Sequence, residues 1–344
     1  MESNTNSVIS KFLVFLLYLV LILSPCFSED NSNITQEKSP VKTFFKDINF
    51  TLGTGLSYLS GQYREIVYPA DNWTTPYWSE LLWNLDNIFL LNLDLGACKG
   101  PWFLNLSLAT AVTKGSGIME DYDWGDYTIT DWTNWSESLI FLDKSFFLDI
   151  NSGYKCSINK QFAIPIKFGY KLNYLDWEDK TGKYIYFWYF DPSPGGYLPT
   201  PDTGDNNGIN GIDYKVIQNI LYASSGILFT WDNVTTGFNL ALSPLIYTWD
   251  LDHHILRNLY FLDSFTANFW YRTELTLKIK TGLQRSFLFT AFLEGLPETV
   301  GDTFQYDESV SSPEEIGIQS GYYKDGAGIA SFMWGIEISY TWTF

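Results

Sequence analysis

The chain lacks the features that mark several large classes of protein. It has 21 basic residues against 39 acidic ones, and the resulting net charge of −18 disfavours nucleic-acid binding and suits cationic partners. Beyond its N-terminal region, no segment approaches the roughly 18 to 20 continuous apolar residues that a membrane helix needs. Histidine occurs only twice, so chemistry that uses an imidazole near neutral pH is confined to His253 and His254.

The N-terminal 28 residues have the composition of a secretory signal. Lys11 precedes an apolar run over residues 12–24, and a small-residue exit ends at Ser28. We therefore predict a signal peptide over residues 1–28 and a mature domain over residues 29–344. Cleavage leaves the net charge at −18, because the removed segment holds one acidic and one basic residue.

Two cysteines, Cys98 and Cys156, remain in the predicted mature chain. Secretion leads to an oxidising compartment, which permits a disulfide between them. A pair of free thiols is the alternative, and the sequence does not choose between the two.

Period-two alternation of apolar and polar residues dominates the mature chain. Aromatic residues make up 18% of the chain, and over residues 332–344 every second residue is aromatic or isoleucine. Similar alternation over residues 162–174 and 269–280 places lysines on the opposite face. These segments exceed the roughly 5 to 6 residues of a typical soluble strand. The pattern predicts a transmembrane β-barrel with its apolar face outward and its polar face toward a lumen, and a soluble β-sandwich is the alternative.

The connections between these segments predict an all-β fold, an antiparallel up-and-down transmembrane β-barrel of about ten strands. In such barrels short turns on the periplasmic rim alternate with long loops outside. Short turns are expected near residues 97–101, 156–160, 232–235 and 282–285. Long polar connections are expected near residues 69–77, 116–135, 176–210, 250–258 and 297–325.

Two acidic clusters, residues 120–124 and 249–254, fall in the long connections and are expected on the extracellular rim. Asp252 and His254 would form a dyad in which the carboxylate orients the imidazole and the imidazole takes a proton from water. Asp121 and Asp123 on the opposite wall could hold that water and share a proton. General-base help of this kind is worth roughly a hundred- to ten-thousand-fold in rate.

Each cluster also has a simpler interpretation. Asp121 and Asp123 alone would form a solvated acidic loop, with weak calcium binding at most. Residues 252–254 could bind zinc, although adjacent histidines in an extended segment point to opposite sides, which makes His253 the less apt residue. Two other functions remain open at this point, a catalytically inactive barrel that acts as a pore or adhesin, and a metal-dependent surface hydrolase.

At these residues the chain resembles the omptins, outer-membrane aspartyl-type endoproteases of Gram-negative bacteria. The resemblance runs in order along nearly the whole mature chain, through residues 59–68, 119–124, 250–254, 325–329 and 340–344. It implies that Asp121 and Asp123 are a catalytic aspartate couple. It also implies that Asp252 and His254 are the catalytic dyad, with His254 closest to the attacking water.

The resemblance further implies a substrate class. Glu65 and Asp250 match the acidic floor of the family's pocket for the side chain before the scissile bond, which implies cleavage after Arg or Lys, often between paired basic residues. The chemistry agrees, because carboxylates in an enclosed pocket favour a guanidinium through charge-assisted hydrogen bonds. We therefore expect cationic peptide or protein substrates, a location in the outer membrane with the site facing the exterior, and no cofactor, metal or nucleic acid.

The chain departs from the family's pattern at two places. A serine and a nearby histidine follow the first acidic motif in well-known members, whereas this chain keeps Ser136 but has Ser138 where the histidine would fall. Only the Asp–His mechanism then remains. Ile217, near Lys215, stands where an arginine that binds lipopolysaccharide is expected. Outer-membrane lipid is an expected partner, and a requirement for lipopolysaccharide is left open.

Overall fold

A computed structural model describes residues 48–69, 75–126, 130–189, 196–205, 208–266, 269–309 and 316–344. The predicted signal peptide, its cleavage site and the beginning of the mature domain lie outside the described residues and stay predictions. Among the residues that the structure describes, no helix is long and apolar enough to cross a membrane.

The described chain is almost entirely β-strand, and its strands form one antiparallel sheet. The strands are β1 (Asn49–Val67), β2 (Ser79–Lys99), β3 (Trp102–Ala111), β4 (Gly115–Asp123), β5 (Asn134–Ser157), β6 (Phe162–Tyr189), β7 (Gly196–Asp205), β8 (Ile212–Trp231), β9 (Val234–His254), β10 (Leu259–Thr266), β11 (Trp270–Lys280), β12 (Arg285–Glu308) and β13 (Ile316–Thr343). The 3-10 turn η2 (Ile255–Arg257) joins β9 to β10.

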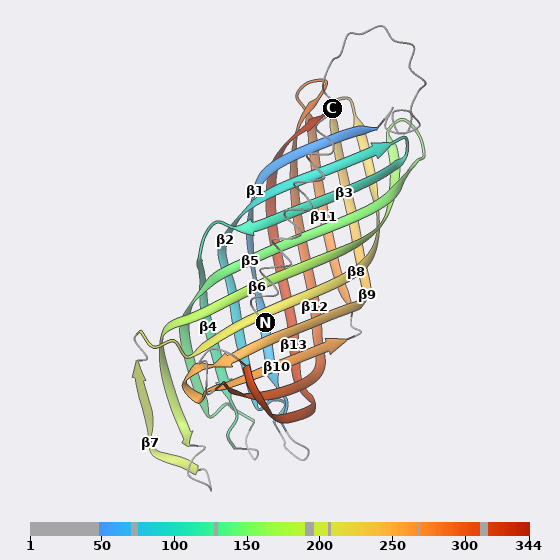
Figure 1. Ribbon diagram of the computed structural model, residues 1–344. Coiled ribbons are helices and arrows are strands. Elements are labelled where there is room, and N and C mark those ends of the chain that lie inside the picture. Colours follow the sequence, from blue (N-terminus) through green and yellow to red (C-terminus); the bar gives the residue numbers. More distant parts are fainter. Residues whose placement is uncertain are drawn as a thin grey trace. The chain divides into compact units, whose positions relative to one another are not determined.

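The sheet closes into a ring because β1 pairs with both β2 and β13. β3 and β4 share one position between β2 and β5, and β10 and β11 share one position between β9 and β12. β7 pairs with the far end of β6 and projects from the ring (Figure 1). The sheet has 13 strands. β7 lies outside the ring, and two positions in the ring each hold two strands, so the ring has ten positions. The predicted all-β barrel of about ten strands is confirmed.

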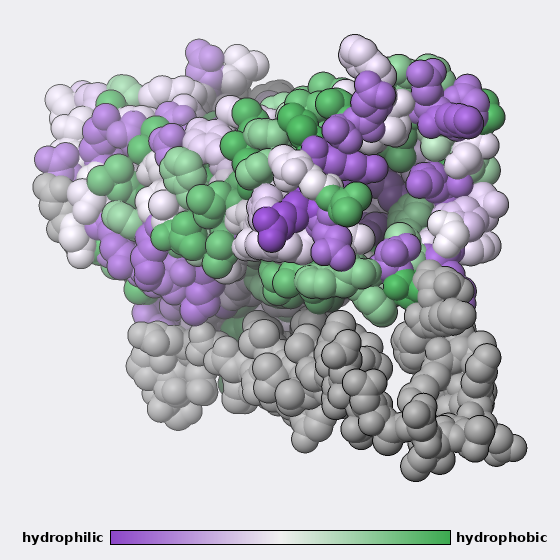
Figure 2. Space-filling view, turned by 90° about the horizontal axis from the view of Figure 1, so that it is seen from above, coloured by the Kyte–Doolittle hydropathy of each residue, from purple (hydrophilic) through white to green (hydrophobic). Residues whose placement is uncertain are grey.

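Alternation along the strands places apolar side chains on the outside of the ring. In β13, Phe332, Trp334, Ile336 and Ile338 are exposed on the outer face. Ser339, on the opposite face of the same strand, is buried. Hydrophobic residues lie over much of the visible surface, between hydrophilic ones (Figure 2). An exposed apolar surface of this extent suits lipid rather than water.

The four predicted short turns are present. β2 and β3 are joined through Gly100, with φ of 60°, and β8 and β9 through Asp232, with φ of 49°. β5 ends at Ser157 just before β6, and β11 ends at Lys280 just before β12. Left-handed backbone at the tip of a tight hairpin is favoured because its twist matches that of the flanking strands.

The predicted long connections are wrong in large part, because the strands continue through them. β6 is 28 residues long and runs to Tyr189, and β9 runs to His254. Crossing a bilayer takes only about 9 to 11 residues per strand. On β6 the outward residues turn polar beyond that length, as at Glu178 and Lys180, so the apolar alternation that signals a strand is lost there while the backbone ladder persists.

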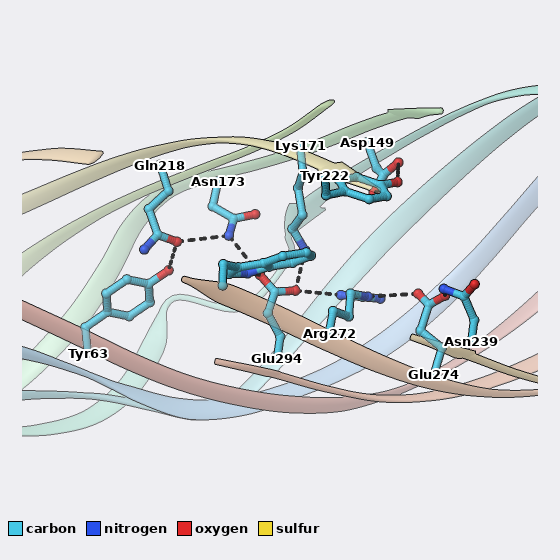
Figure 3. A network of polar contacts seen from close by, with 11 residues as sticks. Tyr63, Asp149, Lys171, Asn173, Gln218, Tyr222, Asn239, Arg272, Glu274 and Glu294 are labelled. Carbon is cyan, nitrogen blue, oxygen red and sulfur yellow. Dashed lines mark hydrogen bonds and ion pairs between the residues drawn. The ribbon is translucent and has the colours of Figure 1, made fainter. Parts of the chain in front are cut away.

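The barrel interior is polar along much of its length. A lumen cavity of about 450 Å3 is lined by residues that include Lys171, Arg272 and Glu294. Glu294 accepts hydrogen bonds from Lys171, from Arg272 at 2.8 Å and from Asn173 at 3.2 Å (Figure 3). Charged strand residues therefore point into the lumen and neutralise one another there.

Cys98 on β2 and Cys156 on β5 are free, half-buried thiols. Of the two alternatives that the sequence left open, the structure has the pair of free thiols.

Candidate active site

The site begins at the end of β9, where Asp250, Asp252 and His254 alternate along the strand. Residues two apart in a strand share a face, so these three side chains point into the ring. Asp250 and Asp252 are 0% and 2% exposed. Nε2 of His254 lies 2.6 Å from Oδ2 of Asp252. The sequence placed this cluster in a loop, which is wrong: the strand ladder itself fixes the carboxylate–imidazole pair.

A second pair of carboxylates comes from β4. Asp121 and Asp123 lie opposite Leu81 and Ser79 of β2, and the Ser79 hydroxyl donates to Asp121 at 3.2 Å. These two aspartates also lie on a strand and not in a loop. The Asp252–His254 pair lies beyond Tyr247, the last exposed apolar residue of β9, at the level where the outward Trp249 and Leu251 are half-buried.

The two pairs face each other across the ring. Burial and the neighbouring charge of Asp123 raise the pKa of Asp121 well above its usual range, and Asp252 adds to this rise. Burial also raises the pKa of Asp123, while the charges of Arg257 and His254 act in the opposite direction. Because the charge of Asp123 opposes the ionisation of Asp121, the pair is suited to hold one proton between them.

Glu65 and Asp250 lie near Asp252, since the charges of Asp252 and Asp250 both act on Glu65, and both rest on an aromatic pair. Nε1 of Trp83 donates to Glu65 at 3.0 Å, and the Tyr214 hydroxyl donates to Asp250 at 2.8 Å. The Trp83 and Tyr214 rings stack with centroids 4.8 Å apart. Both hydrogen-bond donors are neutral, so they orient the two carboxylates without cancelling their charge.

Burial is the main cause that raises the pKa of Glu65, and the charges of Asp252 and Asp250 raise it further. The pKa of Asp250 is raised by burial and by the charge of Asp263. A cation that entered this space would favour the ionised form of both carboxylates.

The two histidines lie on opposite faces of β9. His253 stacks on Tyr260 with ring centroids 3.9 Å apart, and its Nε2 lies 3.8 Å from Oε1 of Glu308. His254 faces Asp252 instead. Within the described ranges, no group of three or more His, Cys, Asp or Glu side chains has the arrangement of a metal site.

Sequence reasoning missed two buried carboxylates of the site. Asp263 on β10 lies directly opposite Asp250. Asp179 on β6 accepts backbone hydrogen bonds from Gly211 at 2.6 Å and Ile212 at 3.0 Å, and Ser138 hydrogen-bonds to it. Neither carboxylate belongs to a motif. The only sign in the sequence is that each carboxylate occupies an inward-facing position in the alternation of its strand.

The fold and these side chains define a membrane-type β-barrel with a cluster of buried carboxylates and one imidazole at one end of its ring. The omptin family model matches residues 46–344, and the chain therefore belongs to the omptin family of outer-membrane proteases. It is 24% identical over 260 residues to the plasminogen activator of Yersinia pestis. This match covers 74% of the chain and 76% of that protein.

The fold is also similar to a solved structure, that of the outer membrane protease OmpT from Escherichia coli. The TM-score is 0.74 at 19% identity, and the match covers 86% of this chain and 97% of that one. The predicted family, outer-membrane location and peptidase class are confirmed, and peptides or proteins are its substrates.

Proposed function

We propose that the protein is an endopeptidase that cleaves after Arg or Lys, often between paired basic residues, on the exterior face of the outer membrane. The observation that carries this proposal is the dyad of Asp252 and His254, 2.6 Å apart, opposite the buried aspartate pair. Water attacks the peptide directly in this scheme, and no side chain forms a covalent intermediate.

In the first step His254 acts as the general base. Because one ring nitrogen is held by Asp252, the other is free to take a proton from water as the water oxygen bonds to the scissile carbonyl carbon. Asp252 then stabilises the imidazolium. The proton passes from His254 to the peptide nitrogen as the carbon–nitrogen bond breaks, which leaves a carboxylic acid and an amine.

Asp121 and Asp123 have the complementary role. A pair that retains one proton at neutral pH offers one hydrogen-bond donor and one acceptor. The acceptor orients the attacking water, and the donor stabilises the negative charge that develops on the carbonyl oxygen. The raised pKa of Asp121 supports this assignment.

Glu65 and Asp250 bind the basic side chain before the scissile bond. Their protein partners are the neutral groups of Trp83 and Tyr214, so a guanidinium or ammonium supplies the missing positive charge. The net charge of −18 also draws cationic substrates toward the cleft.

The test uses the mature chain refolded in detergent and a quenched peptide with a single Arg-Arg pair. We expect cutting at that pair, unaffected by EDTA, and a fall of roughly a hundred- to ten-thousand-fold in kcat for His254→Ala. His253→Ala is the matched control, because it removes the neighbouring imidazole from the opposite face, and it should keep its activity.

Each other outcome counts against a specific part of the proposal. Loss of cutting in EDTA would make the histidine run a metal site and refute direct general-base catalysis by His254. No cutting, with or without added lipopolysaccharide, would favour a barrel that acts as a pore or adhesin. Cutting that appears only with lipopolysaccharide would make that lipid a required partner despite Ile217.

A further inference from the structure

The pocket contains a third carboxylate that no motif indicates. We propose that Asp263 contacts the substrate's basic side chain directly, together with Glu65 and Asp250, and makes the pocket select arginine over lysine. This inference rests on the proposed function and specifies which basic residue the same site prefers.

The position of Asp263 follows from strand pairing. On β10 it lies opposite Asp250 of β9 on one side and Thr303 of β12 on the other. Directly opposed residues share a face, with Cβ atoms about 4.5 to 5.5 Å apart. Asp263 therefore points into the ring beside Asp250. Glu65 points into the same ring from β1, which is separated from β10 by β12 and β13.

The aspartates here have free oxygens that point to a cationic ligand. Asp250 and Asp263 are 0% and 4% exposed, and Oδ1 of each has no hydrogen-bond partner among the described residues. Asp250 also accepts from the Tyr214 hydroxyl on its other oxygen and from the backbone of Asp263, and Thr303 hydrogen-bonds to Asp263. A buried carboxylate oxygen without a donor is costly, and a multi-donor cation would remove that cost at both residues together.

The spread of the acceptors favours a guanidinium. Asp250 and Asp263 lie side by side on β9 and β10, and Glu65 comes from β1, beyond β12 and β13, so the oxygens that a ligand must reach are spread over several strands. One ammonium nitrogen reaches only acceptors within about 3 Å of a single point. A guanidinium presents five N–H donors in a plane and can bond to separate carboxylates at once. Each carboxylate beyond the first therefore adds more to arginine binding than to lysine binding.

The experiment compares two peptides that differ only in Arg or Lys before the scissile bond. The wild-type enzyme should have the higher kcat/KM on the arginine peptide. In Asp263→Asn the arginine-to-lysine ratio of kcat/KM should fall on the order of tenfold, mainly through a higher KM for the arginine peptide, because ground-state binding is lost. Asp307→Asn is the matched control, since it removes an exposed carboxylate from the neighbouring strand and should leave the ratio unchanged.

The outcomes separate this inference from the proposed function. Failure of the wild-type enzyme to cut either peptide refutes the proposed function. Cutting by the wild-type enzyme with equal kcat/KM on both peptides overturns the role of Asp263 alone, and this measurement needs no variant. An unchanged ratio in Asp263→Asn also overturns it. Asp263→Ser, checked for folding by circular dichroism, repeats the test with a smaller side chain that has no carboxylate.

Discussion

The hydroxyl of Tyr214 offers a sharp test of how the pocket is built. Tyr214→Phe removes one atom, the donor that lies 2.8 Å from Oδ2 of Asp250, and keeps the ring that stacks on Trp83. A hydrogen bond to a charged group is worth about 1.5 to 3 kcal/mol. If that energy orients Asp250 for a cation, its loss should lower kcat/KM on an arginine peptide by about tenfold to a hundredfold.

The same change should also alter the pH dependence of KM. The Tyr214 hydroxyl lowers the pKa of Asp250, against burial and the charge of Asp263, which raise it. Without the hydroxyl the pKa of Asp250 rises further, so Asp250 becomes neutral at a higher pH as the solution is acidified. The increase in KM at low pH should therefore begin at a higher pH in the variant than in the wild-type enzyme.

Tyr63→Phe is the matched control for this experiment. The Tyr63 hydroxyl donates to Gln218 at 2.8 Å, and the Tyr63 ring packs edge-on against Trp177. The variant therefore loses an equally buried donor outside the pocket. We expect lower stability but an unchanged KM. Steady-state kinetics on one quenched arginine peptide between about pH 5 and 8 would measure both variants, a range that brackets the pKa of about 7 of the neighbouring Asp263. Equal kinetics for Tyr214→Phe and Tyr63→Phe would refute the orienting role of Tyr214.

Three further predictions concern other residues. Burial raises the pKa of Asp263 from 3.8 to about 7, so the folded state binds a proton more tightly than the unfolded state does, and stability without ligand should fall as pH rises from about 4 to about 7. Thermal melts should show a smaller fall in Asp263→Asn, and parallel curves would contradict it. Asp179→Asn replaces the carboxylate that accepts hydrogen bonds from the backbone of Gly211 and Ile212, and should lower the melting temperature. An unchanged melting temperature would count against this structural role of Asp179. Replacing Cys98 and Cys156 with serine should leave the melt insensitive to reductant, as in the wild-type protein, and a wild-type melt lowered by reductant would reveal a disulfide.

The ring could be predicted from the sequence because apolar and polar residues alternate along the strands that face lipid. Residues 332–338 illustrate this, since every second residue from Phe332 to Ile338 is apolar and exposed on the outside of β13. The same reasoning failed where β6 and β9 continue past the exposed apolar surface. On β9 the alternation persists, since Trp249 and Leu251 alternate with Asp250 and Asp252, but the acidic residues favoured a loop. On β6 the last residues, 184–189, are aromatic or isoleucine on both faces and carry no period-two signal. Backbone hydrogen bonding to neighbouring strands, which a single segment does not reveal, maintains the structure there.

The site was predictable only where its residues are close together in the chain. Asp252 and His254 are two apart in one extended segment, so their pairing follows from the alternation of a strand. Asp263 is brought to Asp250 by the β9–β10 register, which depends on the length of the turn between them. Trp83 reaches Glu65 through the β1–β2 pairing. An isolated aspartate or tryptophan in an alternating segment carries no sign of such a partner.

The lumen and the site contain the same kind of buried carboxylate but neutralise it differently. In the lumen Glu294 is bound by Lys171 and by Arg272, so the protein supplies the positive charge itself. In the site Glu65 and Asp250 are bound by an indole and a phenol, which orient charge without cancelling it. The barrel is therefore able to place cations opposite buried carboxylates. That it places neutral donors in the pocket is the strongest structural argument that the compensating charge comes from a substrate.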